Sequence, residues 1–374
     1  MAVVATHRPT KAIIHKEAIK ANIKNELCRL NKGEELWAVV KADAYGHGLI
    51  EVAKVAKEAG ATGFCVAYVD EGLALRQAGF TDPILVLGVT EPMATVVLAC
   101  QNKLTLAAAS LDWLQRAEKA VSSCEDPLTI HLIIDSGMGR IGFFDEEEMH
   151  KAREFLMNEA QSLKPEGIFT HFATADEKET VYFEKQQQRF TQALGIFGRD
   201  FRYIHTSNTA TALWHEAWES NLIRFGVGMY GMNPSGSVLS LPYPLYPAME
   251  IISEMVYVKQ LRQGDSVSYG ATYTAQEDEW IATLPIGYAD GLLRAYSGFS
   301  VLVEGIDCPI VGRVTMDQIM IRLPKYFPVG TKVTIIGKSG EKENTFTQAA
   351  EHIGTINYEL TSILGERLER IYVD

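Results

Sequence analysis

The chain has 374 residues, and its 47 acidic against 35 basic side chains give a formal net charge of −12. This balance argues against a general nucleic-acid binder, which holds the phosphate backbone with clustered lysine and arginine. With 47% hydrophobic and 22% charged residues, the composition is that of a globular protein with a core, and it excludes a disordered or fibrous chain.

The longest apolar runs are too short to cross a membrane. The run PILVLGV (Pro83 to Val89) has the length of a strand, and the N-terminus shows no basic leader followed by an apolar segment. The five cysteines are widely spaced without a CxxC pair, and the nine histidines form no HExxH pattern. We therefore expect a soluble, unexported cytoplasmic protein without a metal site.

From about Leu36 onward, short apolar runs alternate with amphipathic segments, which is the pattern of a parallel sheet with helical crossovers. One such amphipathic segment, Leu49 to Gly60, has an apolar face and ends in a glycine suited to a left-handed cap. Another, Phe144 to Ala160, begins with an acidic turn that complements the helix dipole. We predict strands at eight places: 36–42, 63–68, 83–88, 104–110, 128–135, 167–172, 202–207 and 222–227.

Eight strand and helix units of this kind predict a (β/α)8 barrel of the TIM type over residues 1–236. After Gly236 the sequence pattern changes. The segment PYPLYP (Pro242 to Pro247) breaks regular structure, and the apolar runs that follow are no longer separated by long helical segments. We predict a second, mostly β domain over residues 237–374, with which residues 1–10 can associate. Its expected elements include a strand around Val267 to Tyr273 and a terminal helix over Asn357 to Tyr372.

Residues at the carboxyl ends of barrel strands are the ones that do chemistry in this fold. Lys41 follows the first predicted strand directly, and a partly buried lysine amine has a lowered pKa and becomes a nucleophile toward aldehydes. Taken singly, a lysine after a strand is more often a solvated end residue. The other candidates at these ends, each with an equally ordinary structural interpretation, are Asp135, Arg140, His171, Asn208 and Arg224.

Taken together, the motifs of the chain resemble those of the alanine racemases, which are pyridoxal-phosphate (PLP) enzymes with a barrel followed by a β domain. Eight segments match the family in order and span nearly the whole chain: AVVKADAYGHG (38–48), DSGMGRIGF (135–143), GIFTHFATADE (167–177), HTSNTAT (205–211), VSYGATY (267–273), LPIGYADG (284–291), PIVGRVTMDQ (309–318) and INYEL (356–360). The lysine motif alone is only moderately specific, whereas eight ordered matches across two domains are very specific.

The resemblance implies a role for each matching residue. Lys41 would hold PLP as a Schiff base and act as one catalytic base, with Tyr269 as the second. Arg224 would face the pyridine nitrogen. Arg140 and the backbone of Met316 would contact substrate carboxylate or cofactor oxygen, with Asp317 beside them in the substrate-binding set. The remaining cofactor-binding residues implied by the family are Tyr45, His171, Asn208, Thr209, Gly226, Val227 and Tyr358, and candidates for a substrate corridor are Asp176, Tyr288, Arg294 and Arg313.

The chemistry fits this set, because racemisation removes an α-proton from one face of a planar intermediate and returns one to the other. The family implies interconversion of L- and D-alanine, supply of D-alanine for peptidoglycan, and a homodimer in which the β domain of one subunit completes the barrel site of the other. Two alternatives stay open: a racemase or related enzyme acting on another small amino acid such as serine, and a PLP carrier without catalysis.

One position departs from the family pattern. Where the family often has a carbamylated lysine two residues after a histidine, this chain has Ile133. An isoleucine can neither carry a carbamate nor hydrogen-bond Arg140. We therefore expect activity that does not depend on carbon dioxide, and we expect Ile133→Lys to be tolerated.

Overall fold

Parallel strands and outer helices form the larger of two compact units, Ile19–Leu245, in the computed structural model, which describes residues 3–215 and 218–374. The other unit joins the residues up to Ala18 with Tyr246–Asp374. The sequence expectation divided the chain after residue 236, ten residues before Tyr246. The segment between these two points, 237–245, contains neither helix nor strand.

The eight strands predicted for the first domain are all present and parallel. In hydrogen-bonded order they run β8-β7-β6-β5-β4-β3-β2-β9. Two backbone bonds between the outer strands, Asn221 N–H to Ile204 O (2.9 Å) and Arg224 N–H to Ser207 O (3.0 Å), close the sheet into a barrel. The strands are β2 (Glu35–Val39), β3 (Gly63–Val66), β4 (Ile84–Val86), β5 (Thr105–Ala108), β6 (Leu128–Ile134), β7 (Leu163–Thr170), β8 (Tyr203–His205) and β9 (Leu222–Phe225).

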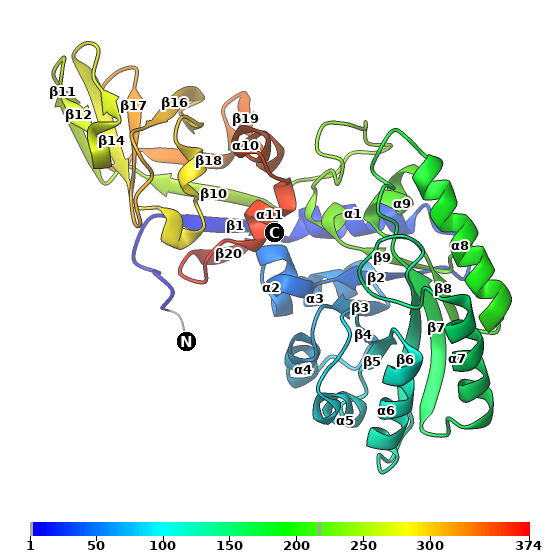
Figure 1. The fold of residues 1–374 in the computed structure, drawn as a ribbon. Helices are drawn as coiled ribbons and strands as arrows, with labels where there is room; N and C mark the ends of the chain where they lie inside the picture. The colour runs from blue at the N-terminus through cyan, green and yellow to red at the C-terminus, as the bar shows by residue number, and fades with distance from the viewer. Residues whose placement is uncertain (1–2, 216–217) are drawn as a thin grey trace. The chain divides into compact units, whose positions relative to one another are not determined.

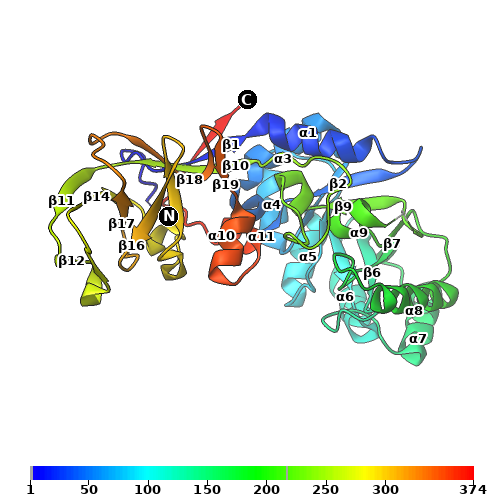
Figure 2. The ribbon, with the colours of Figure 1, turned by 90° about the horizontal axis from the view of Figure 1, so that it is seen from above.

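Helices cover the outside of this barrel, and neighbours such as α7 and α8 lie side by side in Figure 1 and Figure 2. The predicted helices 49–60 and 144–160 are confirmed as α3 and α7: Gly60 caps α3 at φ 112°, and the Asp145 carboxylate accepts the Glu148 N–H at 2.8 Å to begin α7. The helices are α1 (Lys16–Leu27), which begins in the smaller unit, α2 (Lys41–Gly46), α3 (Leu49–Ala59), α4 (Val69–Gln77), α5 (Met93–Gln101), α6 (Leu111–Val121), α7 (Glu146–Asn158), α8 (Val181–Phe197), α9 (Thr209–Trp214) and the 3-10 turn η1 (Val227–Tyr230).

Side chains alternate between the two faces of each strand, and this alternation determines which residues fill the barrel interior. Residues two apart point to the same side, so Trp37 and Val39 of β2 pack inward with Cys65, Leu85, Tyr203 and Leu222. Gly63 and Gly167 make room for large inward rings, since a Cβ on either would lie 2.7 to 2.8 Å from Trp37 or His131. The interior is therefore a filled core that also holds polar side chains.

The second unit is mostly β, as predicted. Its main sheet follows the path β11-β14-β17-β16-β15-β18-β10-β1-β20, with β19 added on β18. The strands are β1 (Lys11–His15), β10 (Met249–Glu254), β11 (Tyr257–Leu261), β12 (Ser266–Val267), β13 (Tyr273–Thr274), β14 (Glu279–Leu284), β15 (Ser300–Val303), β16 (Ile306–Val311), β17 (Ile319–Leu323), β18 (Lys332–Ser339), β19 (Lys342–Asn344) and β20 (Glu369–Val373). Short helices complete it: η2 (Tyr269–Ala271), η3 (Tyr288–Asp290), η4 (Arg294–Tyr296), α10 (Phe346–Ile353) and α11 (Asn357–Ser362).

Two local predictions in this unit are wrong. The terminal helix stops at Ser362, because the following residues bond to other segments. The Gly365 N–H donates to the Asp290 carbonyl at 3.0 Å, and Glu369–Val373 pairs in parallel with β1. The segment from Val267 to Tyr273 is not a continuous strand. Positive φ angles at Ser268, Gly270 and Ala271 turn it into η2 between two very short strands.

The N-terminal residues are held by a buried carboxylate of the same unit. Asp290 is fully buried and accepts hydrogen bonds from Arg8 (2.6 and 2.9 Å), Arg367 (2.8 and 3.0 Å) and the Gly287 N–H (3.0 Å). Burial alone raises the pKa of Asp290, but these hydrogen bonds outweigh it and leave the pKa below its usual value. The carboxylate is thus ionised and joins the N-terminal, central and C-terminal segments of the unit.

We expect Asp290→Asn to lower the free energy of unfolding by about 1–3 kcal/mol, because it takes the buried counter-charge from the partly buried guanidinium of Arg8 and leaves Arg367 with Asp317 alone. Asp307→Asn is the matched control, since Asp307 pairs with Lys342 at the surface and its loss should cost at most about 1 kcal/mol. Urea unfolding followed by circular dichroism compares the two. An equal loss of unfolding free energy in the two variants would show that the Asp290 cluster stabilises the fold no more than a surface ion pair does.

Candidate active site

Lys41 begins a turn of unusual handedness directly after β2. The next four residues, Ala42 to Tyr45, have φ near +53° and ψ between 38° and 53°, which is left-handed helical geometry without a glycine among them. Each such residue costs roughly 1–2 kcal/mol because its Cβ crowds the following carbonyl oxygen. Strain of this size at the end of a barrel strand is typical of a functional segment.

Two carboxylates hold the strained turn. The Glu71 side chain at the start of α4 accepts the Ala42 N–H at 2.7 Å and the Ala67 N–H at 2.7 Å, and so links the turn to the loop after β3. The Asp43 carboxylate accepts the Leu49 N–H at 2.7 Å at the start of α3. The sequence analysis did not single out Glu71, although a carboxylate in the first turn of a helix often binds backbone N–H groups.

The Lys41 amine lies in surroundings that disfavour its charge. Burial lowers its pKa most, and Arg140 and Arg224 lower it further, while Glu71 and Cys65 act in the opposite direction. A lysine with a lowered pKa holds more of the neutral, nucleophilic amine at neutral pH.

Hydroxyl and amide donors gather beside Lys41, at the ends of β8 and β9. Thr209 begins α9, and its Oγ1 accepts the Gly226 N–H at 3.0 Å. A Cβ on Gly226 would lie 3.0 Å from the Tyr45 hydroxyl, so the glycine lets that hydroxyl approach the backbone. Asn208 caps α9 by accepting the Thr211 N–H at 2.9 Å, and Val227, buried, opens η1. The structure thus brings these five predicted residues together.

His171 and Arg140 lie near the same lysine. Burial, followed by the charges of Arg224, Arg140 and Lys41, lowers the pKa of His171 to about 3, which makes it a neutral imidazole at physiological pH. Arg140 follows a tight loop in which the Asp135 carboxylate accepts the N–H groups of Gly137, Gly139 and Arg140 at 2.9 to 3.0 Å. Asp135 therefore shapes the loop that carries Arg140.

Arg224 is buried inside the barrel, and its partners were missed by the sequence analysis. Its Nη1 donates to His205 Nδ1 at 2.7 Å, and its Nη2 donates to the Thr170 carbonyl at 2.8 Å. Burial lowers the pKa of Arg224 to about 10, which still leaves it a cation at neutral pH. The alternation of side chains along β8 could have identified His205. It lies two residues after Tyr203, which points into the barrel, so its side chain points inward as well.

The remaining predicted residues belong to the smaller unit. Tyr269 lies in η2 with 73% of its surface exposed, and Met316 is 52% exposed. The Asp317 carboxylate binds Arg367 at 2.7 Å, and Tyr358 is half-buried in α11. The loop of Met316 accepts the N–H of Ala289 at 3.1 Å, which joins the LPIGYADG and VTMDQ segments.

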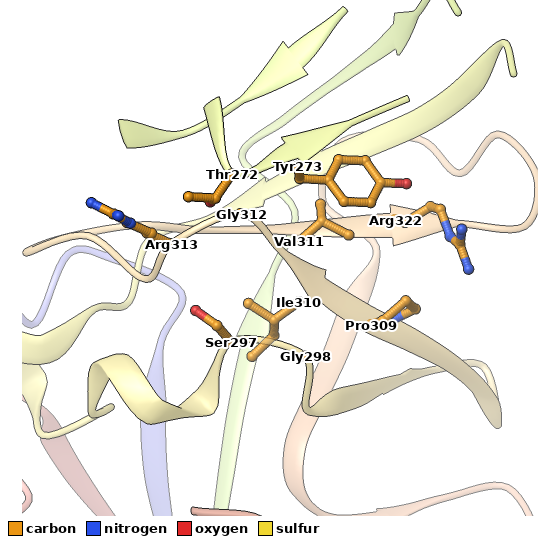
Figure 3. Close-up of a pocket in the computed structure, with 10 residues that line it drawn as sticks. All are labelled: Thr272, Tyr273, Ser297, Gly298, Pro309, Ile310, Val311, Gly312, Arg313 and Arg322. Atoms are coloured by element: carbon orange, nitrogen blue, oxygen red, sulfur yellow. The ribbon is translucent and has the colours of Figure 1, made fainter. Parts of the chain in front are cut away.

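A groove of about 530 Å³ lies in this smaller unit next to the Tyr269 turn (Figure 3). Two of its lining residues are basic, Arg313 and Arg322, and Tyr273 lies between them in Figure 3. Arg313, a corridor candidate, also contacts the turn itself, since its carbonyl accepts the Ser268 hydroxyl at 2.8 Å. Among the described residues, no cluster of three or more histidine, cysteine or acidic side chains is arranged to hold a metal ion, and no helix is long and apolar enough to span a membrane.

Comparison with known proteins settles the family. The alanine racemase N-terminal domain model matches residues 14–234, and the alanine racemase C-terminal domain model matches residues 248–372. The chain belongs to the alanine racemase family. It is 55% identical to the alanine racemase of Pediococcus pentosaceus over 372 residues, covering 100% of this chain and 98% of the relative.

Solved structures of the family give the same fold. The crystal structure of the alanine racemase from E. faecalis superposes with a TM-score of 0.97 at 49% identity, with both chains covered completely. A histidine racemase from Leuconostoc mesenteroides superposes with a TM-score of 0.91 at 34% identity, again over both complete chains. The (β/α)8 barrel followed by a mostly β domain is therefore confirmed, and the fold is common to racemases named for different amino acids.

The departure at Ile133 has a structural basis. Its side chain is 4% exposed and packs with Ala107 and Phe169 inside the barrel, against Leu87, Ala109 and Ile141. These apolar contacts occupy the position where members of the alanine racemase family often carry a modified lysine. They do not support the expectation that lysine is tolerated here, because a buried ammonium without a partner is costly.

We expect Lys41→Met to stabilise the ligand-free protein at neutral pH, by about 1.4 kcal/mol for each unit by which the folded state lowers the pKa of Lys41. The folded pKa lies below the unfolded value of 10.5, so the gain is full below the folded pKa and disappears as the pH rises through 10.5. Thermal unfolding from pH 7 to 11 measures it. Exposed Lys54→Met is the control and should stay within about 0.5 kcal/mol at every pH; the same profile in both variants would contradict the expectation.

Proposed function

We propose that this chain is a PLP-dependent alanine racemase that interconverts L- and D-alanine. The observation that carries the proposal is the environment of Lys41: a buried amine with a lowered pKa, beside two arginines and a neutral histidine, at the carboxyl end of a barrel strand. Relatives named alanine racemase that are 50 to 55% identical over the full length support alanine as the substrate.

The residues present fit PLP. The Tyr45 hydroxyl, the Thr209 hydroxyl and the N–H groups around Gly226 and Val227 form a set of donors suited to a phosphate, and the Gly226 backbone leaves room that a Cβ would fill. Lys41 supplies the amine that binds the aldehyde. We propose that Asn208 and His171 border the ring and that Tyr358 contributes a further phosphate donor, as the family resemblance implies.

When bound, PLP withdraws electrons from the α-carbon of the amino acid and so acidifies its α-proton. In the proposed reaction, Lys41 Nζ takes or returns the proton on one face and the Tyr269 phenolic oxygen does so on the other. Arg140 and the backbone of Met316 position the substrate carboxylate, with Asp317 beside them. Arg224 offers a donor to the pyridine nitrogen, where a carboxylate would instead promote protonation, so we infer that it keeps that nitrogen unprotonated.

We propose that the active form is a homodimer with composite sites. The high exposure of Tyr269 and Met316 supports this, because a catalytic tyrosine needs neighbours that its own unit does not supply. On this proposal, specific activity falls as the protein is diluted through the dimer dissociation constant measured by analytical ultracentrifugation. Constant specific activity in a range where the monomer predominates would overturn it.

The main alternative is a racemase of another amino acid. The histidine racemase of the same fold gives this alternative weight, because the barrel and β domain alone do not select the side chain. Serine is also close to alanine, since an apolar pocket discriminates poorly against one added hydroxyl. A PLP carrier without catalysis remains the alternative of a different class, and it predicts cofactor binding without any exchange of the α-proton.

The deciding experiment incubates the protein and PLP with L-alanine in heavy water. We expect α-proton loss by NMR and inversion by circular dichroism to grow together, because both bases act. L-Serine and L-histidine run in parallel under the same conditions. Exchange of alanine without inversion would mean that a single base works, faster turnover of another amino acid would assign a different substrate, and no signal with any of them would favour the carrier.

Carbon dioxide should not affect this enzyme. Ile133 has no amine to carry a carbamate, and the residues that pack around it are apolar. We therefore expect the same kcat in buffer freed of carbon dioxide and in buffer with added bicarbonate. A marked loss on depletion would indicate a carbamylated lysine elsewhere in the chain.

We further propose a biosynthetic role, the supply of D-alanine for peptidoglycan, as the family implies. A cytoplasmic location stays a prediction from the cysteine pattern.

A further inference from the structure

A chain of buried polar groups continues from Arg224 toward the opposite end of the barrel, and none of the roles above uses it. Beyond the Arg224 contact, His205 Nε2 lies 2.9 Å from His131 Nδ1, and His131 Nε2 lies 4.0 Å from the carboxylate of Glu166. Both histidines are fully buried. Glu166 itself reaches the surface, where Lys164 (3.2 Å) and Arg202 (3.6 Å) pair with it.

The proton positions in this chain follow from one fact: a guanidinium donates hydrogen bonds and never accepts them. His205 Nδ1 must therefore accept from Arg224, which puts the proton of the neutral ring on Nε2. That proton is donated to His131 Nδ1, so His131 in turn carries its proton on Nε2. This last N–H has no hydrogen-bond partner among the described residues, and the Glu166 carboxylate lies 4.0 Å from it. Glu166 therefore acts on the ring through its charge, as the negative end of a directional chain.

The two rings have little freedom to leave this arrangement. The His131 ring lies flat against the backbone of Gly167, where a Cβ would be 2.8 Å away, and it stacks on Trp37 at 5.9 Å between centroids. The His205 ring stacks on Phe169 at 4.7 Å and 12°, and the Arg224 guanidinium lies over the same Phe169 ring at 5.2 Å. The packing thus fixes which nitrogen each ring presents to its neighbour.

The pKa shifts of His205, His131 and Glu166 agree with these proton positions. Burial and Arg224 hold the pKa of His205 well below its usual value, and burial also lowers the pKa of His131, so both rings are neutral at physiological pH. His131 is the main cause that lowers the pKa of Glu166 to about 2, with Lys164 adding to it. A carboxylate at one end therefore faces a guanidinium at the other through two neutral rings.

We infer that Glu166, His131 and His205 are positioning residues for Arg224. They fix the His205 tautomer that accepts from Nη1, while Thr170 O accepts from Nη2, so that the guanidinium is held in one orientation with Nε left for the cofactor ring. Among the described residues no hydrogen-bond partner is found for Arg224 Nε. The inference deepens the proposed function and rests on it, because it assigns Arg224 the pyridine nitrogen.

The first test reads the tautomers directly and needs no turnover. In the holoenzyme labelled with 15N-histidine, we expect His131 and His205 to show an unprotonated Nδ1 and a protonated Nε2 from pH 6 to 9. A protonated Nδ1 on His205 in the wild type would overturn the inference.

The second test breaks the chain at its far end. Glu166→Leu removes the carboxylate that lies 4.0 Å from His131 Nε2, while Glu166→Gln keeps a polar oxygen there. Glu35→Leu is the matched control, because Glu35 is also an acidic residue of a barrel strand and its carboxylate binds Tyr203 and Trp37 instead of the histidines. We expect Glu166→Leu and His131→Phe to shift the 15N signals of His205 and to lower kcat for alanine about tenfold or more, with KM changed less than about twofold.

Comparing Glu166→Gln with Glu166→Leu distinguishes a positioning role of Glu166 from a role in stability alone. Glu166→Gln should keep the wild-type His205 signals and most of kcat, and Glu35→Leu should lower Tm without moving either. If Glu166→Leu and His131→Phe lower Tm but leave the His205 signals and kcat unchanged, the chain is structural only and the inference fails. If instead the wild type does not turn over alanine, the proposed function fails, while the tautomer measurement still decides the hydrogen-bond chain.

Discussion

A cation buried inside an apolar barrel is the constraint on which the rest of the site depends. Arg224 lies on the inward side of β9, where the neighbouring positions are filled by Trp37, Phe169 and Ile133. Isolated burial of such a charge is prohibitive unless hydrogen bonds and a counter-charge compensate. The carbonyls of Thr170 and His205 and the ring of His205 supply the bonds. Around Lys41, Arg224 and Arg140 act together, and Glu71 acts in the opposite direction.

Burial and positive charge together set the electrostatics around Lys41. Burial lowers the pKa of His171 and of Lys41 most, and the positive charges of Arg224 and Arg140 lower both further, so that the pKa of His171 falls to about 3. On the proposed function, the site binds an anionic phosphate and an amino-acid carboxylate, and positive charge favours both. On the same proposal, the lowered pKa of Lys41 keeps its amine available as a base.

The sequence alone predicted the strands of the barrel, but it did not predict the hydrogen-bonded polar groups in the barrel interior. Eight apolar runs at regular spacing predicted eight strands, because the period of a buried strand and the caps at Gly60 and Asp145 are local signals. The chain through His205, His131 and Glu166 depends instead on side chains from three neighbouring strands, β8, β6 and β7, so no short segment contains it. Similarly, the run from Asn357 to Tyr372 has helical spacing of its leucines, and only the pairing of Glu369–Val373 with β1, more than 350 residues away, makes its end a strand. The site residues were found by resemblance to a family, while Glu71 and Asp290, whose partners are mainly backbone groups or distant arginines, were not.

The left-handed turn after Lys41 connects backbone strain with the placement of the site's side chains. Four consecutive residues adopt a conformation that the isolated chain avoids, so the surrounding fold must supply the free energy. Part comes from charge-assisted bonds of Glu71 and Asp43 to backbone N–H groups, which are stronger than neutral ones. Part comes from Tyr230, whose hydroxyl donates to the Val39 carbonyl at 3.0 Å and whose ring contacts Tyr45 at 4.9 Å. The turn brings the amine of Lys41 and the hydroxyl of Tyr45 to the same barrel mouth within a single turn of chain. A right-handed turn would satisfy the backbone more cheaply, but it would direct these side chains differently, and it is this difference in direction that the strain maintains.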